Sequence, residues 1–119
     1  MIDPLYEYRA IVKRWIDGDT VVVDWDLGRR IWVHDEHLRL FGYNAADKDK
    51  AKKLAATQFM ERLAPPGTEV LLSTIEDKTE KYGRYLAGIY IDPDAPSLNE
   101  QIVGAGLGIP WNGKGVKPE

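Results

Sequence analysis

Two carboxylates stand close together in the segment Asp17-Gly18-Asp19-Thr20. The glycine between them lets the backbone turn sharply, so that their oxygens can converge on one point. Converging carboxylate oxygens are typical ligands of a hard cation such as calcium. An Asp-Gly pair is equally typical of a β-hairpin turn that does no chemistry. The segment therefore predicts a turn, and it predicts a cation site only where other residues join it.

Two later segments carry cations that could hold a phosphate. Arg39 lies in the apolar run Leu38-Arg39-Leu40-Phe41, where its guanidinium must pair with an anion or reach outward to water. Lys81-Tyr82-Gly83-Arg84 places two cations beside an aromatic ring, which suits gripping a phosphate and stacking a base. Taken alone, each segment is also compatible with an ordinary solvated surface.

Composition limits the chemistry that the chain can perform. Its 119 residues, 44% of them hydrophobic, suit one domain over 1–119, and no apolar run approaches the roughly 20 residues that span a bilayer. The lack of cysteine excludes a disulfide framework and a thiolate zinc site, so any metal must be held by oxygen atoms or by the two histidines. With 16 basic and 19 acidic residues the net charge is −3, so a nucleic-acid site must be local.

The elements that position these segments can be read from residue patterns. β-Branched and aromatic residues predict a hairpin of strands over 6–16 and 20–25, followed by a third strand over 30–41 that is interrupted by the polar residues 34–37. Trp15, Trp25 and Trp32 alternate with β-branched neighbours, which predicts that they pack inside a barrel.

In the second half of the chain, the spacing of the apolar residues changes. Apolar residues at three- and four-residue steps predict one long helix over 48–63, which the prolines at 65 and 66 stop. Strands over 68–76 and 84–91 follow, and Ser97 with Glu100 has the capping-box spacing that opens a short helix. We expect the tail from about residue 110 to be loosely ordered. The order β-β-β-α-β-β-α predicts a five-stranded β-barrel with helices, of the OB-fold kind.

In their order along the chain, these segments resemble the thermonuclease (staphylococcal nuclease) family. The resemblance covers about residues 11–107. It rests on DGDT at 17–20, LRLFGYNAAD at 38–47, PPGTEV at 65–70, EKYGRYLA at 80–87 and SLNE at 97–100. It implies a compact bacterial or phage-type member: a calcium-dependent phosphodiesterase that cuts DNA and RNA with little sequence specificity and leaves 3′-phosphates. Mg²⁺ or Mn²⁺ could replace the calcium.

The resemblance also implies metal ligands. Asp19 matches the metal-binding aspartate, and Asn44 falls where the family often has a second aspartate. Ala45 falls where a main-chain carbonyl completes the ligand set. Because calcium affinity follows ligand charge, the neutral amide of Asn44 predicts weaker binding, towards the ~10⁻³ M end of the protein range.

The implied catalytic residues are Arg39, Asp47 and Arg84. The two arginines match those that grip the phosphate, and Asp47 falls on the glutamate that orients or deprotonates the attacking water. Lys81 and Tyr82 match residues that line the nucleotide site. The shorter side chain of Asp47 retracts its carboxylate by somewhat over ~1 Å, and a displacement of that size can lower a rate ~100-fold. We therefore expect reduced activity.

Other interpretations stay open at this stage. Asn44, Asp47 and the acidic pI of 5.4 also fit a nuclease-like barrel that has lost catalysis and only binds nucleic acid or a protein partner. A carbohydrate-binding barrel rests on fold analogy alone. Retention of Asp19, Arg39 and Arg84 together favours the enzyme, because a binding module needs no such set of acid and guanidiniums.

The remaining expectations concern the surface of the domain, its location and its partners. His34 and His37 lack ligand partners at suitable spacing, which favours a solvated loop. Lysines at 48, 50, 52 and 53 oppose the helix dipole, so they either contact a nucleic-acid backbone or form a solvated face. The charged opening of the chain is unlike a secretory signal. We expect a cytoplasmic monomer with DNA or RNA as its partner and no membrane contact.

Overall fold

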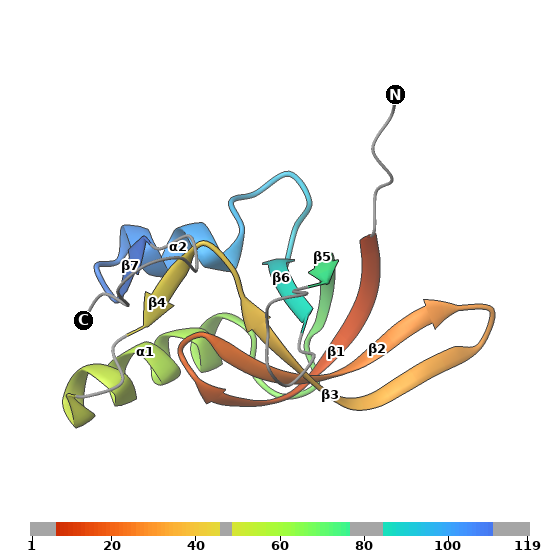
Figure 1. Cartoon of the computed structure of the whole chain (residues 1–119), viewed down its shortest axis with the longest axis horizontal. Helices are drawn as coiled ribbons and strands as arrows, with labels where there is room; N and C mark the ends of the chain where they lie inside the picture. The colour runs from red at the N-terminus through yellow and green to blue at the C-terminus, as the bar shows by residue number, and fades with distance from the viewer. Residues whose placement is uncertain (1–6, 46–48, 77–84, 111–119) are drawn as a thin grey trace.

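The computed structural model describes residues 7–45, 49–76 and 85–110 (Figure 1). These residues form a closed barrel with the strand order β1-β2-β3-β6-β5, together with two helices and a separate two-stranded sheet. The elements are β1 (Glu7–Asp17), β2 (Thr20–Gly28), β3 (Ile31–Leu40), β4 (Tyr43–Ala45), α1 (Lys50–Leu63), β5 (Glu69–Glu76), β6 (Tyr85–Tyr90), α2 (Leu98–Gly104) and β7 (Gly108–Pro110).

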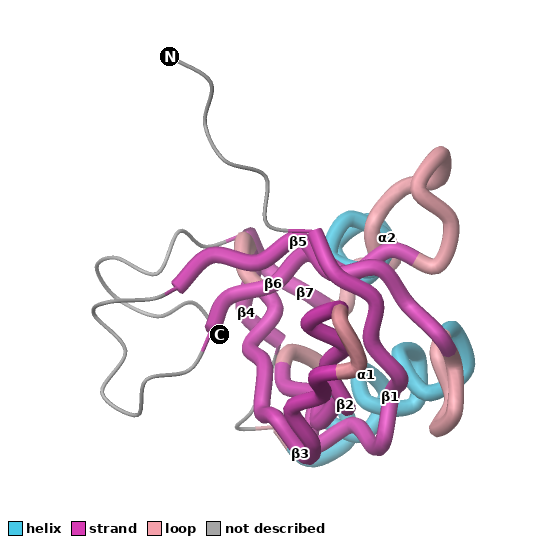
Figure 2. Tube along the Cα trace, turned by 90° about the vertical axis from the view of Figure 1, so that its right-hand side faces the viewer, coloured by secondary structure: helices cyan, strands magenta, loops and turns pink. Residues whose placement is uncertain are grey.

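Strand pairing confirms the predicted OB-fold-like barrel. β1 pairs with both β2 and β5, and β5 pairs with β6, in each case antiparallel. β3 and β6 close the barrel as parallel neighbours, with Leu38 opposite Tyr85. Figure 2 shows the strands enclosing the interior, with both helices on one side of them. In the described part of the chain, neither helix has the length and apolarity to cross a membrane.

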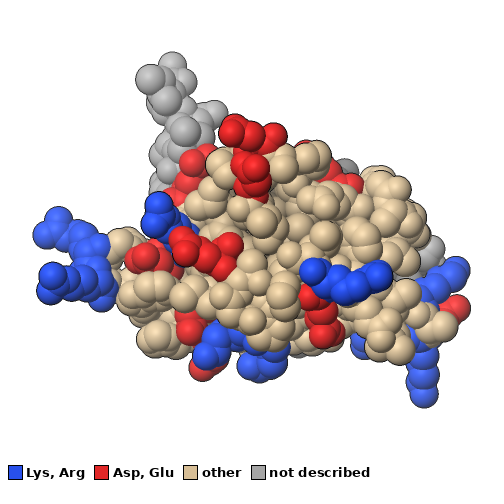
Figure 3. Space-filling model, turned by 180° about the vertical axis from the view of Figure 1, so that it is seen from behind, with Lys and Arg blue, Asp and Glu red and all other residues tan. Residues whose placement is uncertain are grey.

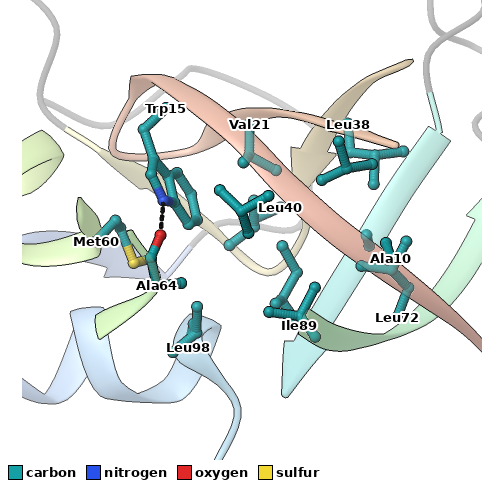
Figure 4. Packing of buried hydrophobic residues seen from close by; sticks show 14 of the residues in the cluster. Ala10, Trp15, Val21, Leu38, Leu40, Met60, Ala64, Leu72, Ile89 and Leu98 are labelled. Atoms are coloured by element: carbon teal, nitrogen blue, oxygen red, sulfur yellow. Dashed lines mark hydrogen bonds between the residues drawn. The ribbon is translucent and has the colours of Figure 1, made fainter. Parts of the chain in front are cut away.

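The barrel interior is filled by alternating side chains of the strands, as the sequence pattern predicts. Trp15 and Trp25 are buried. The indole Nε1 of Trp15 donates a 2.9 Å hydrogen bond to the main-chain oxygen of Ala64, which fixes the end of α1 against β1 (Figure 4). The prediction for Trp32 was wrong: its side chain is 41% exposed and stacks on His34 outside the barrel.

Two predicted boundaries also need correction. β3 runs without a break from Ile31 to Leu40, because the polar residues form a bulge at Asp35 (φ 56°) that keeps the strand paired with β2. The helix begins at Lys50 rather than at residue 48, because Asp49 caps it by accepting from two main-chain N–H groups.

The short sheet of β4 and β7 was not predicted. Pro110, expected in a loose tail, pairs with Tyr43 in this sheet, and residues 111–119 lie outside the described part. Strands of three residues carry almost no periodic signal, which explains why the sequence does not reveal them. The sheet matters here because β4 carries two of the expected metal ligands.

Candidate functional site

The expected site begins at the turn between β1 and β2. Asp17 pairs with Thr20, so Gly18 and Asp19 form the two-residue loop, and the main-chain N–H of Asp19 donates to the Asp17 carboxylate (3.1 Å). Gly18 does not have a positive φ. A Cβ on Gly18 would lie 2.7 Å from the Cβ of Ala56. Glycine is therefore needed here for close packing on α1 rather than for the turn conformation.

Two hydrogen bonds from distant residues hold this turn in place. The buried Tyr43 hydroxyl donates to the main-chain oxygen of Gly18 (2.6 Å), and the main-chain N–H of Leu40 donates to the main-chain oxygen of Asp19 (2.9 Å). Burial raises the pKa of Tyr43 well above its usual range, so this hydroxyl stays a donor. The position of Asp19 is thus set by β3 and β4 as well as by its own hairpin.

The Asp19 carboxylate is almost fully buried and lies at the centre of the site. Its Oδ1 accepts from the Thr20 hydroxyl (3.3 Å), and its Oδ2 accepts from the main-chain N–H of Ala45 (3.2 Å). Nη1 of Arg39 lies 3.6 Å from the same Oδ2, and both side chains are shielded from solvent. These donors fix one orientation of the carboxylate.

Arg39 connects Asp19 to Asn44. Its Nη2 donates to the amide Oδ1 of the buried Asn44 at 3.4 Å. The register of β2 and β3, with Thr20 opposite Arg39, brings the guanidinium to the turn. Both polar contacts are longer than the roughly 2.7–2.9 Å of a tight charge-assisted bond.

The electrostatics of Asp19 are unusual for a carboxylate. Burial, followed by the neighbouring Asp17 carboxyl, raises the pKa of Asp19 from its ordinary value of 3.8 to about 6. Arg39 and the N–H of Ala45 act in the opposite direction but do not outweigh burial. The fold therefore holds a negative charge that it disfavours, as functional sites often do.

Four of the expected site residues are thus brought together, from three separate segments: Asp19, Arg39, Asn44 and Ala45. The other four expected residues lie outside the described part of the chain; they are Asp47, Lys81, Tyr82 and Arg84.

The donor set of the site consists of oxygen atoms. Asp19 offers a carboxylate, Asn44 an amide oxygen and Ala45 a main-chain carbonyl, all of which suit calcium better than zinc. No three His, Asp or Glu side chains of the described residues converge as a metal site. The residues that could hold a calcium ion are therefore Asp19, Asn44 and Ala45, one charged ligand and two neutral ones, although Asp19 and Asn44 already accept hydrogen bonds within the protein.

The other charged candidates lie away from this site. His34 contacts Asp24 on the exposed outer side of β3 (3.2 Å), and it approaches no further carboxylate or histidine that could form a metal site among the described residues. Lys50, Lys52 and Lys53 are exposed in the first turn of α1, which holds no acidic residue. The exposure of the lysines agrees with the sequence analysis. His34 and His37 are exposed as expected but lie in β3 rather than in a loop.

Sequence reasoning missed the roles of Gly18 and Tyr43 in holding the turn. Tyr43 is 25 residues from Gly18, so no spacing rule links them, and the Asp-Gly pair already had an adequate explanation as a turn. A comparison with models of known protein families gives no match for this chain. A search of curated proteins gives no match either.

Proposed function

We propose that this protein is a metal-dependent nuclease that hydrolyses phosphodiester bonds of DNA and RNA with little sequence specificity. The observation that carries the proposal is that one guanidinium, of Arg39, approaches both the Asp19 carboxylate and the Asn44 amide at one end of an OB-fold-like barrel. An acid and a neutral oxygen can hold a metal ion, and a guanidinium can stabilise the charge that develops in phosphodiester hydrolysis. The motif resemblance to thermonucleases supports the same function.

The chemical difficulty of the reaction is negative charge. The phosphate oxygens repel a nucleophile, and in-line attack adds further charge to them. Calcium, held by Asp19, Asn44 and the carbonyl of Ala45, would supply positive charge next to the scissile phosphate. Arg39 presents a planar fork of donors that fits phosphate oxygens, and it already lies beside Asp19 and Asn44, where calcium would bind.

The remaining roles come from the resemblance. Asp47 would accept a proton from the attacking water, and Arg84 would supply the second guanidinium. Lys81 and Tyr82 would contact the nucleotide, and the products would carry 3′-phosphates. Because such a site reads phosphate and one stacked base, little sequence preference is expected.

A cleavage assay tests the proposal. Single-stranded DNA, double-stranded DNA and RNA are incubated with the protein in calcium, in magnesium and in chelator. We expect calcium-dependent fragments, a loss of roughly 10²–10³-fold in kcat/KM for Arg39→Ala, and no calcium-dependent cleavage for Asp19→Ala. Arg14→Ala, which removes an exposed arginine from β1, is the matched control. Full-rate cleavage by Arg39→Ala would contradict the proposal.

One observation favours a second candidate, a barrel that binds nucleic acid or a protein without cutting. Both Asp19 oxygens already accept hydrogen bonds from the protein, and Oδ2 also faces Arg39, an arrangement that could be purely structural. Nucleic-acid binding without fragments at high protein concentration would favour this candidate. Asp47→Glu then tests the reach of the carboxylate: gained cleavage would show that the missing methylene limits the reaction.

A further inference from the structure

The outer half of the β2–β3 hairpin, residues 26–34 (the arm), extends beyond the barrel at the end of the molecule (Figure 1). Within the described residues, β3 pairs with β6 only over Leu38–Leu40, and β2 pairs with β1 no further than Asp26. The arm tip therefore has solvent on most sides. Leu27, Ile31 and Trp32 are each at least 40% exposed there, which is unusual for large apolar side chains grouped together.

The turn at the tip has a backbone conformation that its two residues disfavour. Gly28 pairs with Ile31, so Arg29 and Arg30 are the two turn residues, and both have positive φ (55° and 66°). A two-residue turn with positive φ at both positions favours Asn-Gly. Arginine in the left-handed region is disfavoured, and such local conflicts tend to occur where a side chain has a function.

The tip is also cationic. Segment 27–33 contains two arginines and no acidic residue, and neither arginine forms an ion pair with another described residue. The two carboxylates of the paired strand β2 are engaged: Asp26 accepts from the Gly28 N–H (2.8 Å), and Asp24 contacts Lys13 and His34. Figure 3 shows basic side chains gathered at this end of the molecule.

Next to these cations lies an exposed pair of rings. Trp32 and His34 are two residues apart, so they share one face of β3, and their rings are nearly parallel (7°) with centroids 6.5 Å apart. The side chain of His34 is 69% exposed. An accessible ring beside free guanidiniums suits an unstacked base and its phosphate, which a single-stranded nucleic acid offers and a duplex does not.

We propose that the arm is a second binding surface for single-stranded nucleic acid, in which Arg29 and Arg30 contact phosphates and Trp32 stacks on a base. Addition of a protein strand to the free edge of β3 fits less well, because the bulge at Asp35 interrupts that edge. By strand length the tip lies roughly 25 Å from Arg39. The arm therefore binds a part of the strand remote from the site. Only its effect on cleavage rests on the proposed function.

The decisive variant is Arg29→Asn/Arg30→Gly. It removes both cations and installs the residues that the turn favours, so we expect an unchanged or higher melting temperature. Binding of a fluorescent oligonucleotide of about 20 nucleotides, longer than one OB-fold site, is measured in chelator. We expect at least tenfold weaker binding and a salt-dependence slope (log K against log salt) shallower by about 1.4, for two lost phosphate contacts. Arg14→Ala/Arg62→Ala removes two exposed arginines elsewhere and should bind more tightly than the arm variant.

A second variant tests the aromatic contact. Trp32→Ala should weaken binding by roughly 5- to 100-fold and reduce the quenching of tryptophan fluorescence by the oligonucleotide. Wild-type affinity and slope in the folded Asn-Gly variant would overturn the proposal. The proposal would also be overturned if the Asn-Gly variant kept its nucleic-acid binding and lost only its self-association, measured by sedimentation. The arm would then be a contact between copies of the protein.

These measurements separate the two proposals. Arm-dependent binding without any cleavage by the wild type would mean that the nuclease proposal fails and the arm proposal holds. Cleavage that requires Arg39, together with unchanged binding in the Asn-Gly variant, would give the opposite result. If both hold, the Asn-Gly variant should lower kcat/KM on long single strands but leave cleavage of a dinucleotide, too short to reach the arm, unchanged.

Discussion

Asp19 meets two demands that oppose each other. As the metal ligand of the proposed function it must be ionised, whereas its buried position next to Asp17 disfavours that charge and raises its pKa to about 6. Arg39 and the N–H of Ala45 offset part of the difference. A buried carboxylate of this kind lowers the stability of the fold at neutral pH, which makes Asp19 a sensitive position for substitution.

Asp19→Asn tests this conflict directly. The amide has nearly the same shape and can still accept from the N–H of Ala45, but it carries no charge. A pKa difference of about two units corresponds to about 3 kcal/mol, so we expect the variant to be more stable at pH 7 by about 1–3 kcal/mol in urea unfolding. Calcium-dependent cleavage should be lost. A variant less stable than the wild type would show that the charge on Asp19 holds the fold together.

The same pKa gives a pH dependence with a defined sign. The folded-state pKa of Asp19 lies above the ordinary value of 3.8, so folding favours the protonated form. Its stabilising contribution is complete below pH 3.8 and is lost as the pH rises to about 6. The stability advantage of Asp19→Asn over the wild type should therefore grow between about pH 4 and pH 6 and then level off. Urea unfolding of both proteins across this range measures it, and a constant difference would contradict the assignment.

At the scale of elements, the site depends on how tightly the β1–β2 turn packs on its neighbours. Gly18 sits against Ala56 of α1 and Ala45 of β4, and the Tyr43 hydroxyl holds its carbonyl. β4 is only three residues long, yet Tyr43 and Ala45 contact the turn and Asn44 contacts Arg39. The geometry around Asp19 is therefore a property of the packing between elements, rather than of the hairpin alone.

Gly18→Ala should disturb that packing. The added methyl would lie 2.7 Å from the Cβ of Ala56 and 3.0 Å from that of Ala45, and overpacking of this kind destabilises by about 1–3 kcal/mol. We also expect cleavage to fall, because the turn carries Asp19. Gly104→Ala is the matched control: it lies at the end of α2 with open space around it and should be neutral or slightly stabilising. Equal effects of both changes on thermal unfolding would refute the packing argument.

At the scale of the whole molecule, a single buried side chain ties the barrel to α2. The Asn99 amide donates to the main-chain oxygens of Phe41 (2.8 Å) and Ala87 (3.0 Å). Its oxygen accepts from the N–H of Ile89 (3.1 Å). These contacts join the chain just after β3 to β6, where the two strands run parallel. Asn99 thus closes the barrel at the end where Arg39 lies.

Asn99→Ala should destabilise the whole domain. It leaves main-chain groups buried without their partner, and such a loss costs about 2–4 kcal/mol. Gln101→Ala, which removes one exposed hydrogen bond to Pro96 from the same helix, should change the free energy of unfolding by less than about 0.5 kcal/mol. Urea unfolding compares the two. Similar values for both variants would mean that the barrel is closed by strand pairing alone.

The sequence by itself determined the barrel, the long helix and the capped second helix, because these depend on periodicity, turn residues and caps that act over a few positions. It also predicted the grouping of Asp19, Arg39, Asn44 and Ala45, through the order of motifs along the chain. It misplaced Trp32, because alternation along a strand does not reveal where that strand leaves the barrel.

Only the tertiary structure decided the short sheet of β4 and β7, the steric need for Gly18 and the bond from Tyr43 to the turn. It also decided the raised pKa of Asp19 and the exposed position of the arm. Each of these depends on residues far apart in the chain, or on how much solvent the folded protein excludes. Local sequence patterns carry neither kind of information, because burial and long-range contacts exist only after the elements have packed together.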